Sequence, residues 1–214
     1  MAVSSELYEA ILTGDARTAH AATQAAIDSG IGPMELITGS MVPAMNEVGR
    51  LYEAEEYFVP ELLLAGRAMK SAMELLRPLI AAAGLKLSNR IIIGTVKGDL
   101  HDIGKNLVAA MLEGGGFDVL DIGADVSPEK FIEAAKSRNA NIVCLSALLT
   151  VTMPAMRTTI EAFKQAGVRE QVKIMVGGAP VTRQFAAEIG ADGYSDNAST
   201  AVALARQLIA AAQP

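Results

Sequence analysis

Apolar positions in the first 85 residues recur at helical spacing. Ser5 and Asp15 are expected to cap a short helix and a longer one that reaches Ser29-Gly30, and Pro33 suits the first turn of a third helix. A fourth helix is predicted by apolar residues at i+3 and i+4 spacing: Phe58, Leu62, Ala65, Met69, Ala72, Leu76 and Leu79. The pattern therefore predicts a bundle of four helices.

The pattern changes near residues 84–90, after which short β-branched runs alternate with helical stretches. Strands are expected at Arg90–Val96, Phe117–Leu120, Ile142–Leu145, Val172–Val176 and Gly193–Tyr194. Helices are expected at Asp102–Glu113, Pro128–Ser137, Pro154–Ala166, Thr182–Ile189 and Ala198–Ala212. This alternation predicts an α/β fold with a five-stranded parallel sheet, flavodoxin-like (Rossmann-like), in the order 2-1-3-4-5. We expect a helical-bundle domain over residues 1–86 and a Rossmann-like domain over 87–214.

Composition narrows the class of protein. An apolar content of 51% is enough for a core, while 24 acidic against 18 basic residues argue against nucleic acid or an anionic membrane as a partner. No apolar stretch reaches the roughly 18 residues that a membrane span needs, and the N-terminus has no basic region typical of a signal peptide. The single cysteine, Cys144, lies in an apolar run and predicts a buried thiol. We expect a cytoplasmic protein.

The sequence Asp99-x-His101-x-x-Gly104 carries the candidate chemistry. It follows the apolar run Ile91–Ile93 and opens an amphipathic stretch, so it is expected where a buried strand turns into a helix. A carboxylate two residues before a histidine can hold one ring nitrogen and leave the other free for a metal.

Two further segments are expected beside this motif. Ser146-Ala147-Leu148 closes the third predicted strand and Gly177-Gly178-Ala179 closes the fourth, so all three segments meet at the carboxyl edge of the sheet. The paired glycines allow a bulky ligand to approach the backbone. Ser146, Thr150 and Thr152 supply hydroxyls to a ligand or to the carboxylate.

Other known sites with similar residues fit poorly. A phosphate-binding P-loop has four residues between its glycines and then Lys-Ser or Lys-Thr, whereas five separate Gly98 from Gly104 and Asn106 follows the lysine. The spacing of Gly94, Gly98 and Gly104 also differs from the G-x-G-x-x-G pattern of a dinucleotide-binding loop. A phosphorelay receiver needs an acid where Ser146 stands. His20 and the methionines Met41, Met45, Met69 and Met73 are expected to have structural roles.

Together these residues resemble the cobalamin-binding module of cobalamin-dependent methionine synthase and of the small corrinoid proteins that serve methylamine, methanol and aryl-ether methyltransferases. That family carries D-x-H-x-x-G, then S-x-L about forty residues later, then G-G slightly under thirty residues on. Here 41 residues separate Gly104 from Ser146 and 28 separate Leu148 from Gly177. Met45-Asn46-x-Val48-Gly49 and Phe58-x-Pro60 resemble the family's helical cap motif, so the resemblance covers nearly the whole chain.

The resemblance implies a cobalamin cofactor, as methylcobalamin, cob(I)alamin or a related corrinoid, bound base-off/His-on. His101 would be the lower axial cobalt ligand, Asp99 would bond it, and Thr152 would bond Asp99 where a serine is common. The displaced nucleotide tail would pass Ser146, Gly177, Gly178 and Ala179. Further contacts would come from Gly98, Leu100, Asp102, Ile103, Gly104, Leu148 and Thr150. Tyr52 and Val59 would cover the upper face, and Thr38 stands where methionine synthase has a cobalamin-contacting glutamate.

The implied function is that of a methyl carrier and not of a complete enzyme. A substrate-specific methyltransferase would methylate the cobalt and a second methyltransferase would pass the methyl group to tetrahydrofolate or a thiol, with a reductive activase as a further partner. The helical cap would shield the methyl group and move aside about a hinge at Leu85–Arg90. A cobalamin-dependent sensor or a mutase subunit is the alternative, and the sequence does not identify the methyl donor.

Overall fold

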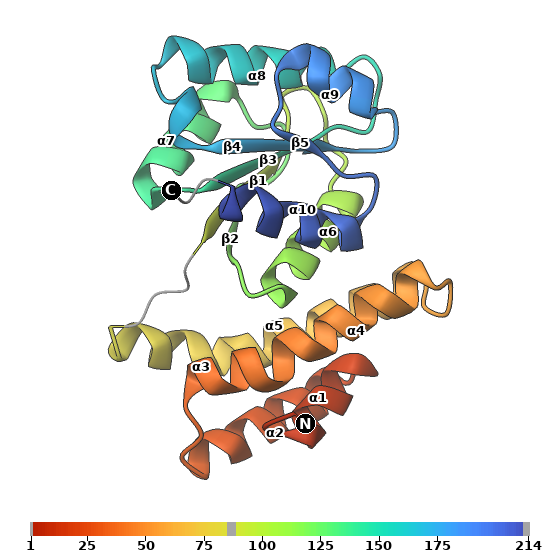
Figure 1. Ribbon diagram of the computed structural model, residues 1–214, viewed down its shortest axis with the longest axis vertical. Helices are drawn as coiled ribbons and strands as arrows, with labels where there is room; N and C mark the ends of the chain where they lie inside the picture. Colours follow the sequence, from red (N-terminus) through yellow and green to blue (C-terminus); the bar gives the residue numbers. More distant parts are fainter. Residues whose placement is uncertain (1, 85–88, 212–214) are drawn as a thin grey trace. The chain divides into compact units, whose positions relative to one another are not determined.

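The computed structural model describes residues 2–84 and 89–211, which divide into two compact units (Figure 1). We call residues 1–87 with 110–117 the helical unit, and residues 88–109 with 118–214 the sheet unit. The expected boundary at residues 86 and 87, and most of the expected hinge at Leu85–Arg90, fall outside the described residues. Both therefore stay predictions. No described helix is long and apolar enough to cross a membrane.

The helical unit contains the expected bundle. Its helices are α1 (Ser5–Leu12), α2 (Ala16–Asp28), a continuous run made of α3 (Pro33–Leu36), a π-helical turn (Ile37–Met41) and α4 (Val42–Glu53), and the long α5 (Val59–Ala82). The core of this unit is formed by completely buried side chains from all of these helices, among them Leu7, Leu36, Met41, Leu62 and Leu76. The four methionines expected in the core are all buried.

Two details of the expected helices are wrong. The N-cap of α1 is Ser4 and not Ser5, because the Ser4 hydroxyl accepts a hydrogen bond from the Leu7 amide at 3.3 Å. On α5, Phe58 precedes the helix and is 61% exposed, while Leu79 is 37% exposed. Ile80 is buried in place of Leu79, because it lies i+4 from Leu76 and so continues the buried face.

The sheet unit has the predicted topology. Its parallel strands are β1 (Arg90–Thr95), β2 (Asp118–Asp121), β3 (Ile142–Ser146), β4 (Lys173–Gly177) and β5 (Gly193–Tyr194), in the order β2-β1-β3-β4-β5. Helices α7 (Pro128–Arg138), α8 (Pro154–Gln165) and α9 (Arg183–Ile189) cover one face, and α6 (Ile103–Gly114) and α10 (Ala198–Ala210) lie on the other (Figure 1). The end of α6, from residue 110, is part of the helical unit. Strand and helix ends lie within two residues of those expected, and several match without a difference, whereas a short 3₁₀ turn (Arg169–Gln171) was not expected.

The core of the sheet unit anchors the carboxyl edge of the sheet. Phe131 of α7 and Phe163 of α8 are completely buried against the strands. Strand register then pairs Thr95 with Ser146 and Ser146 with Gly177. The last residues of β1, β3 and β4 thus lie side by side, as the sequence predicts, and the loops that leave them start from neighbouring points. Cys144 is buried within β3, and its burial raises the pKa of the thiol to about 12.

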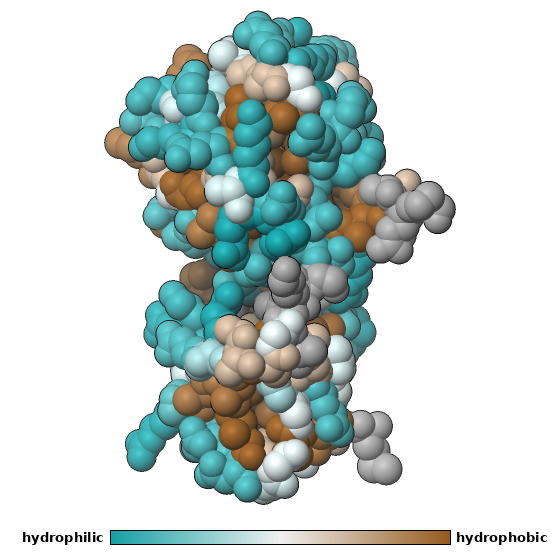
Figure 2. All heavy atoms as spheres, turned by 90° about the vertical axis from the view of Figure 1, so that its left-hand side faces the viewer, coloured by the Kyte–Doolittle hydropathy of each residue, from teal (hydrophilic) through white to brown (hydrophobic). Residues whose placement is uncertain are grey.

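Apolar residues also reach the surface. Figure 2 shows one face of the molecule, on which hydrophilic side chains predominate and apolar ones appear in patches. In the sheet unit the most exposed large apolar side chains are Val151, Leu100 and Ile103, with exposed fractions of 80%, 76% and 72%. All three belong to loops or a helix start at the carboxyl edge of the sheet. Such a concentration of exposed apolar surface is typical of a ligand-binding or interaction site.

Candidate functional site

The loop that joins β1 to α6 presents a buried carboxylate and a half-exposed imidazole. The Asp99 side chain is completely buried, whereas half of the His101 side chain is exposed. The loop leaves β1 through a turn at Gly98, whose φ of +86° lies in the left-handed region that favours glycine. Thr95, the last residue of β1, closes the loop because its hydroxyl donates to the His101 carbonyl at 2.9 Å.

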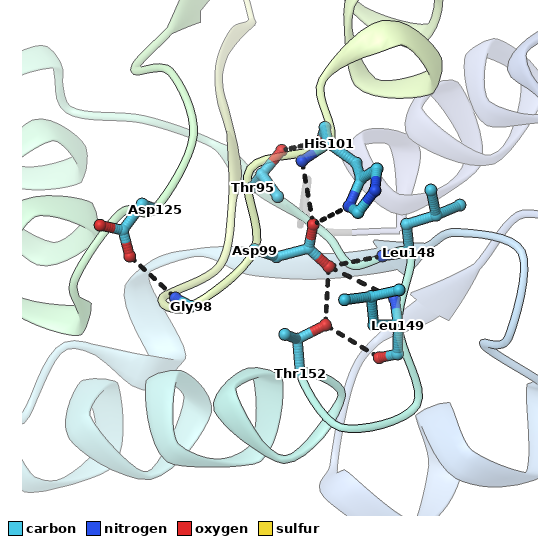
Figure 3. A network of polar contacts seen from close by, with 8 residues as sticks. All are labelled: Thr95, Gly98, Asp99, His101, Asp125, Leu148, Leu149 and Thr152. Atoms are coloured by element: carbon cyan, nitrogen blue, oxygen red, sulfur yellow. Dashed lines mark hydrogen bonds and ion pairs between the residues drawn. The ribbon is translucent and has the colours of Figure 1, made fainter.

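Asp99 accepts hydrogen bonds from two chain segments (Figure 3). Its Oδ1 accepts from the His101 backbone amide at 3.0 Å and contacts the His101 Nδ1 at 2.8 Å. Its Oδ2 accepts from the Thr152 hydroxyl at 2.6 Å and from the Leu148 amide at 2.8 Å, with the Leu149 amide further away at 3.4 Å. The hydrogen bonds that the family resemblance implies between Thr152, Asp99 and His101 are thus present, and we call these three residues the relay.

These hydrogen-bond donors keep the Asp99 carboxyl group ionised. Burial by itself would raise the pKa of Asp99, but the hydrogen bonds from Thr152, from the amides of His101 and Leu148 and from the His101 ring outweigh it and hold the pKa well below its usual value. An ionised carboxylate can only accept, so Nδ1 of His101 carries the ring proton that points to Asp99. The lone pair of a neutral imidazole is then on Nε2, where it can coordinate a metal.

Strands β3 and β4 place further predicted site residues at the carboxyl edge of the sheet, beside the His101 loop. Ser146 ends β3 beside Gly177, which ends β4. Gly178 has a φ of +133°, and a Cβ there would lie 1.9 Å from the Ala147 carbonyl oxygen, so only glycine fits. Ala179 is exposed directly after it. The two strand ends therefore form a surface without large side chains next to the His101 loop.

Other predicted residues line the open side of the loop. Leu100, Asp102, Ile103 and Gly104 are exposed around His101, and a Cβ added at Gly104 would meet no atom within 4 Å. Leu148 and Thr150 are exposed on the loop after β3. Tyr52, half-buried at the end of α4, and Val59, 40% exposed at the start of α5, belong to the helical unit, as does Thr38, whose hydroxyl donates to the Met34 carbonyl. Any contribution of these three to the cofactor site therefore stays a prediction.

Sequence reasoning missed three contributors to the site. Thr95 bonds the His101 carbonyl, Asp125 bonds the Gly98 amide, and Val151 adds exposed apolar surface. Asp125 follows β2, the neighbour of β1, so the rule that parallel strands end at one edge could have found it. Its partners include the Gly98 backbone amide and the Asp99 backbone carbonyl, and a sequence does not show which backbone groups a side chain will bond.

The residues around His101 suit a metal that is bound within a macrocyclic cofactor. Among the described residues no group of three His, Cys, Asp or Glu side chains is arranged to hold a metal ion. A metal at His101 would therefore have fewer than three such protein ligands among the described residues, and a cofactor could supply the others. The exposed apolar side chains of Leu100, Ile103 and Val151 and the open space above Gly104 suit a large, partly apolar ring.

Comparison with known proteins identifies the cofactor. Two family models, each described as a B12 binding domain, match residues 89–203 and residues 3–77. The fold and the site thus define a protein that binds cobalamin or a related corrinoid.

Known relatives narrow the class further. Dimethylamine corrinoid protein 1 of Methanosarcina acetivorans is 46% identical over 84% of this chain and 85% of its own length, and the dimethylamine corrinoid protein of Methanosarcina barkeri is 43% identical over 96% of each. A cobalamin-binding protein from Desulfitobacterium hafniense is 32% identical, with a TM-score of 0.77 over 97% of this chain and 99% of that one. A chain of the methanol:cobalamin methyltransferase complex of M. barkeri is 29% identical, with a TM-score of 0.85 over 96% and 78%. The chain belongs to the family of B12-binding corrinoid proteins.

Proposed function

We propose that the chain is the methyl-carrying corrinoid protein of a methylamine methyltransferase system. The observation that carries the proposal is the Thr152–Asp99–His101 relay, which holds one imidazole with its Nε2 free at an open apolar edge. The names of the relatives, dimethylamine corrinoid proteins among them, support the methylamine class, with dimethylamine as the first candidate donor.

The chain's part in the reaction is to hold and protect the cofactor. When bound, the corrinoid supplies a cobalt centre on which a methyl group can be carried. His101 would donate its Nε2 to the lower face of the cobalt, in the base-off/His-on mode. Asp99 would keep the ring proton on Nδ1 and fix the ring plane, and Thr152 would keep the carboxylate in place.

The same edge of the sheet would accommodate the rest of the cofactor. Ser146, Gly177, Gly178 and Ala179 would border the nucleotide tail, because the paired glycines leave room and the serine hydroxyl offers a hydrogen bond. Gly98, Leu100, Asp102, Ile103, Gly104, Leu148 and Thr150 would contact the ring or the upper tail. The assignment of Tyr52 and Val59 to the methyl-bearing face rests on the family resemblance alone.

Two enzymes would act on the loaded protein. A substrate-specific methyltransferase would recognise the methylamine and methylate the cobalt, and a second methyltransferase would remove the methyl group to a thiol or tetrahydrofolate. A reductive activase would restore the protein after oxidation. The carrier would not need to recognise the amine, so donor specificity would belong to the first enzyme.

Methyl transfer in vitro tests this function. The cobalamin-loaded, reduced protein should accept a methyl group from dimethylamine in the presence of a dimethylamine methyltransferase, measured by the change in the corrinoid absorption spectrum. His101→Ala should slow the transfer at least about tenfold, whereas His20→Ala, on the exposed surface of α2, should match the native rate. Failure with dimethylamine but transfer with monomethylamine or methanol and their enzymes would overturn the donor and keep the carrier role. Failure with every donor would overturn both.

A further inference from the structure

Asp125, in the loop between β2 and α7, contacts the His101 loop through both its side chain and its backbone. Its Oδ1 accepts a hydrogen bond from the Gly98 amide at 2.8 Å, and its Oδ2 pairs with the Lys97 Nζ at 3.0 Å. Its own amide donates to the Asp99 carbonyl at 2.9 Å. Asp125 thus contacts three consecutive residues of the turn that ends in the relay carboxylate. Figure 3 shows the bond to Gly98.

The loop that carries Asp125 is itself held to β1. The Ile122 amide donates to the Ile93 carbonyl and the Thr95 amide donates to the Gly123 carbonyl, both at 2.9 Å, and the Val126 amide donates to the Thr95 carbonyl at 3.0 Å. These bonds continue the β1–β2 pairing past the strand ends. Asp125 is therefore fixed relative to β1 and can hold the neighbouring turn in place.

Asp125 also has an unusual backbone conformation. Its φ of +54° lies in the left-handed region, which is uncommon for residues other than glycine and costs free energy unless the surroundings hold it. Residues held in this way are often found at functional sites. Asparagine and aspartate tolerate the region better than most residues, so an amide at this position could keep the same backbone.

We propose that Asp125 is a positioning residue for the axial-ligand loop, acting through Gly98 and Asp99 on the orientation of His101. The proposal rests on the proposed role of His101. With the Gly98 amide bound, the turn places Asp99 so that Oδ1 faces His101 and Oδ2 faces Thr152. Without that bond the turn can relax, and the carboxylate can rotate away from the ring.

The hydrogen bond to the Gly98 amide, and not the ion pair with Lys97, is the contact of Asp125 that positions the loop. The Lys97 and Asp125 side chains are 60% and 40% exposed, and an ion pair so open to water contributes little. The bond from Gly98 restrains the backbone directly before Asp99. An asparagine, which keeps an acceptor oxygen and loses the charge, should therefore substitute for Asp125.

Four variants separate these contributions: Asp125→Asn, Asp125→Ala, Asp125→Gly and Lys97→Met. Asp125→Gly removes the carboxylate but accepts a positive φ without strain, so it distinguishes the side chain from the backbone conformation. The first readout is the nitrogen splitting in the electron paramagnetic resonance spectrum of the cobalt(II) form of protein labelled with ¹⁵N only in histidine, in which the doublet from ¹⁵N gives the ratio of histidine-bound to histidine-free cobalamin. The second needs no cofactor: nuclear magnetic resonance of the apoprotein reports whether the His101 Nδ1 proton is hydrogen-bonded, with His20→Ala as background.

The Ala and Gly variants should lower the histidine-bound ratio about tenfold, the size expected for one lost hydrogen bond, and should weaken the Nδ1 signal in the apoprotein. Asp125→Asn and Lys97→Met should stay within about twofold of the native ratio. A native-like ratio and Nδ1 signal in both Asp125→Ala and Asp125→Gly would overturn the proposal. So would a native-like Gly variant beside a defective Ala variant, since strain alone would then explain the effect. A native protein with no histidine ligation would overturn the role of His101, while the apoprotein readout would still test Asp125.

Discussion

Asp99 is the residue on which the site depends. Its buried carboxylate would be costly without partners, and donors from the His101 loop and from the loop after β3 offset that cost. The two carboxylate oxygens of Asp99 have different partners: Oδ1 contacts His101, and Oδ2 accepts hydrogen bonds from the segment 148–152. The position of His101 therefore depends on two loops that are about fifty residues apart in the chain.

Thr152 is the partner that can be varied with least disturbance. Thr152→Ser keeps the hydroxyl and should leave cobalamin binding and methyl transfer within about twofold of native. Thr152→Val keeps the shape but leaves Oδ2 with one donor fewer, which should destabilise the apoprotein by about 1–3 kcal/mol and reduce histidine ligation.

Urea unfolding of the apoprotein measures the loss of stability in Thr152→Val, and the electron paramagnetic resonance spectrum of the cobalt(II) form measures histidine ligation. Equal stability and equal histidine ligation in the Val and Ser variants would show that the hydroxyl contributes nothing to the relay.

At the scale of elements, the packing of the strands explains where the site lies. Gly94 of β1 lies under the Phe131 ring of α7, where a Cβ would come within 2.8 Å of the ring and 2.9 Å of Ile122. The close approach lets α7 cover the strand directly before the His101 loop. Phe131 is completely buried there, so the element that precedes the loop is held firmly.

Substitution at Gly94 should affect stability without touching the site residues. Gly94→Ala should lower the free energy of unfolding of the apoprotein by about 1–3 kcal/mol, because the added methyl group overpacks the interface with Phe131. Gly104→Ala is the matched control, since its methyl group would meet no atom within 4 Å and would lie in a helix that favours alanine. Denaturant unfolding compares the two variants. A Gly94→Ala protein as stable as Gly104→Ala would contradict the packing account.

For the whole molecule, patterns along the chain were enough to predict the sheet order and the three segments that meet at its edge. The strand runs are short and β-branched, and the rule that parallel strands end at one edge then brings Asp99, Ser146 and Gly177 together. The relay to Thr152 came from family resemblance, since spacing alone does not tell which hydroxyl faces a carboxylate.

The errors of prediction have physical reasons. Ser4 and Ser5 have the same side chain, and only the backbone geometry decides which one caps α1. Leu79 and Ile80 are neighbours of similar hydropathy, and the choice between them depends on the rotation of a long helix. Asp125 bonds the Gly98 backbone amide and the Asp99 backbone carbonyl, and such backbone groups are present at nearly every position of a sequence.

The most direct test of the account is the identity of the nitrogen beneath the cobalt. The protein is labelled with ¹⁵N only in histidine, loaded with unlabelled cobalamin and reduced to the cobalt(II) form for electron paramagnetic resonance. If His101 is the axial ligand, each cobalt line should be split into a doublet, and His101→Ala, but not His20→Ala, should abolish the doublet. A triplet from ¹⁴N would mean that the cofactor's own base stays bound, and it would contradict the central claim, as would a doublet that persists in His101→Ala.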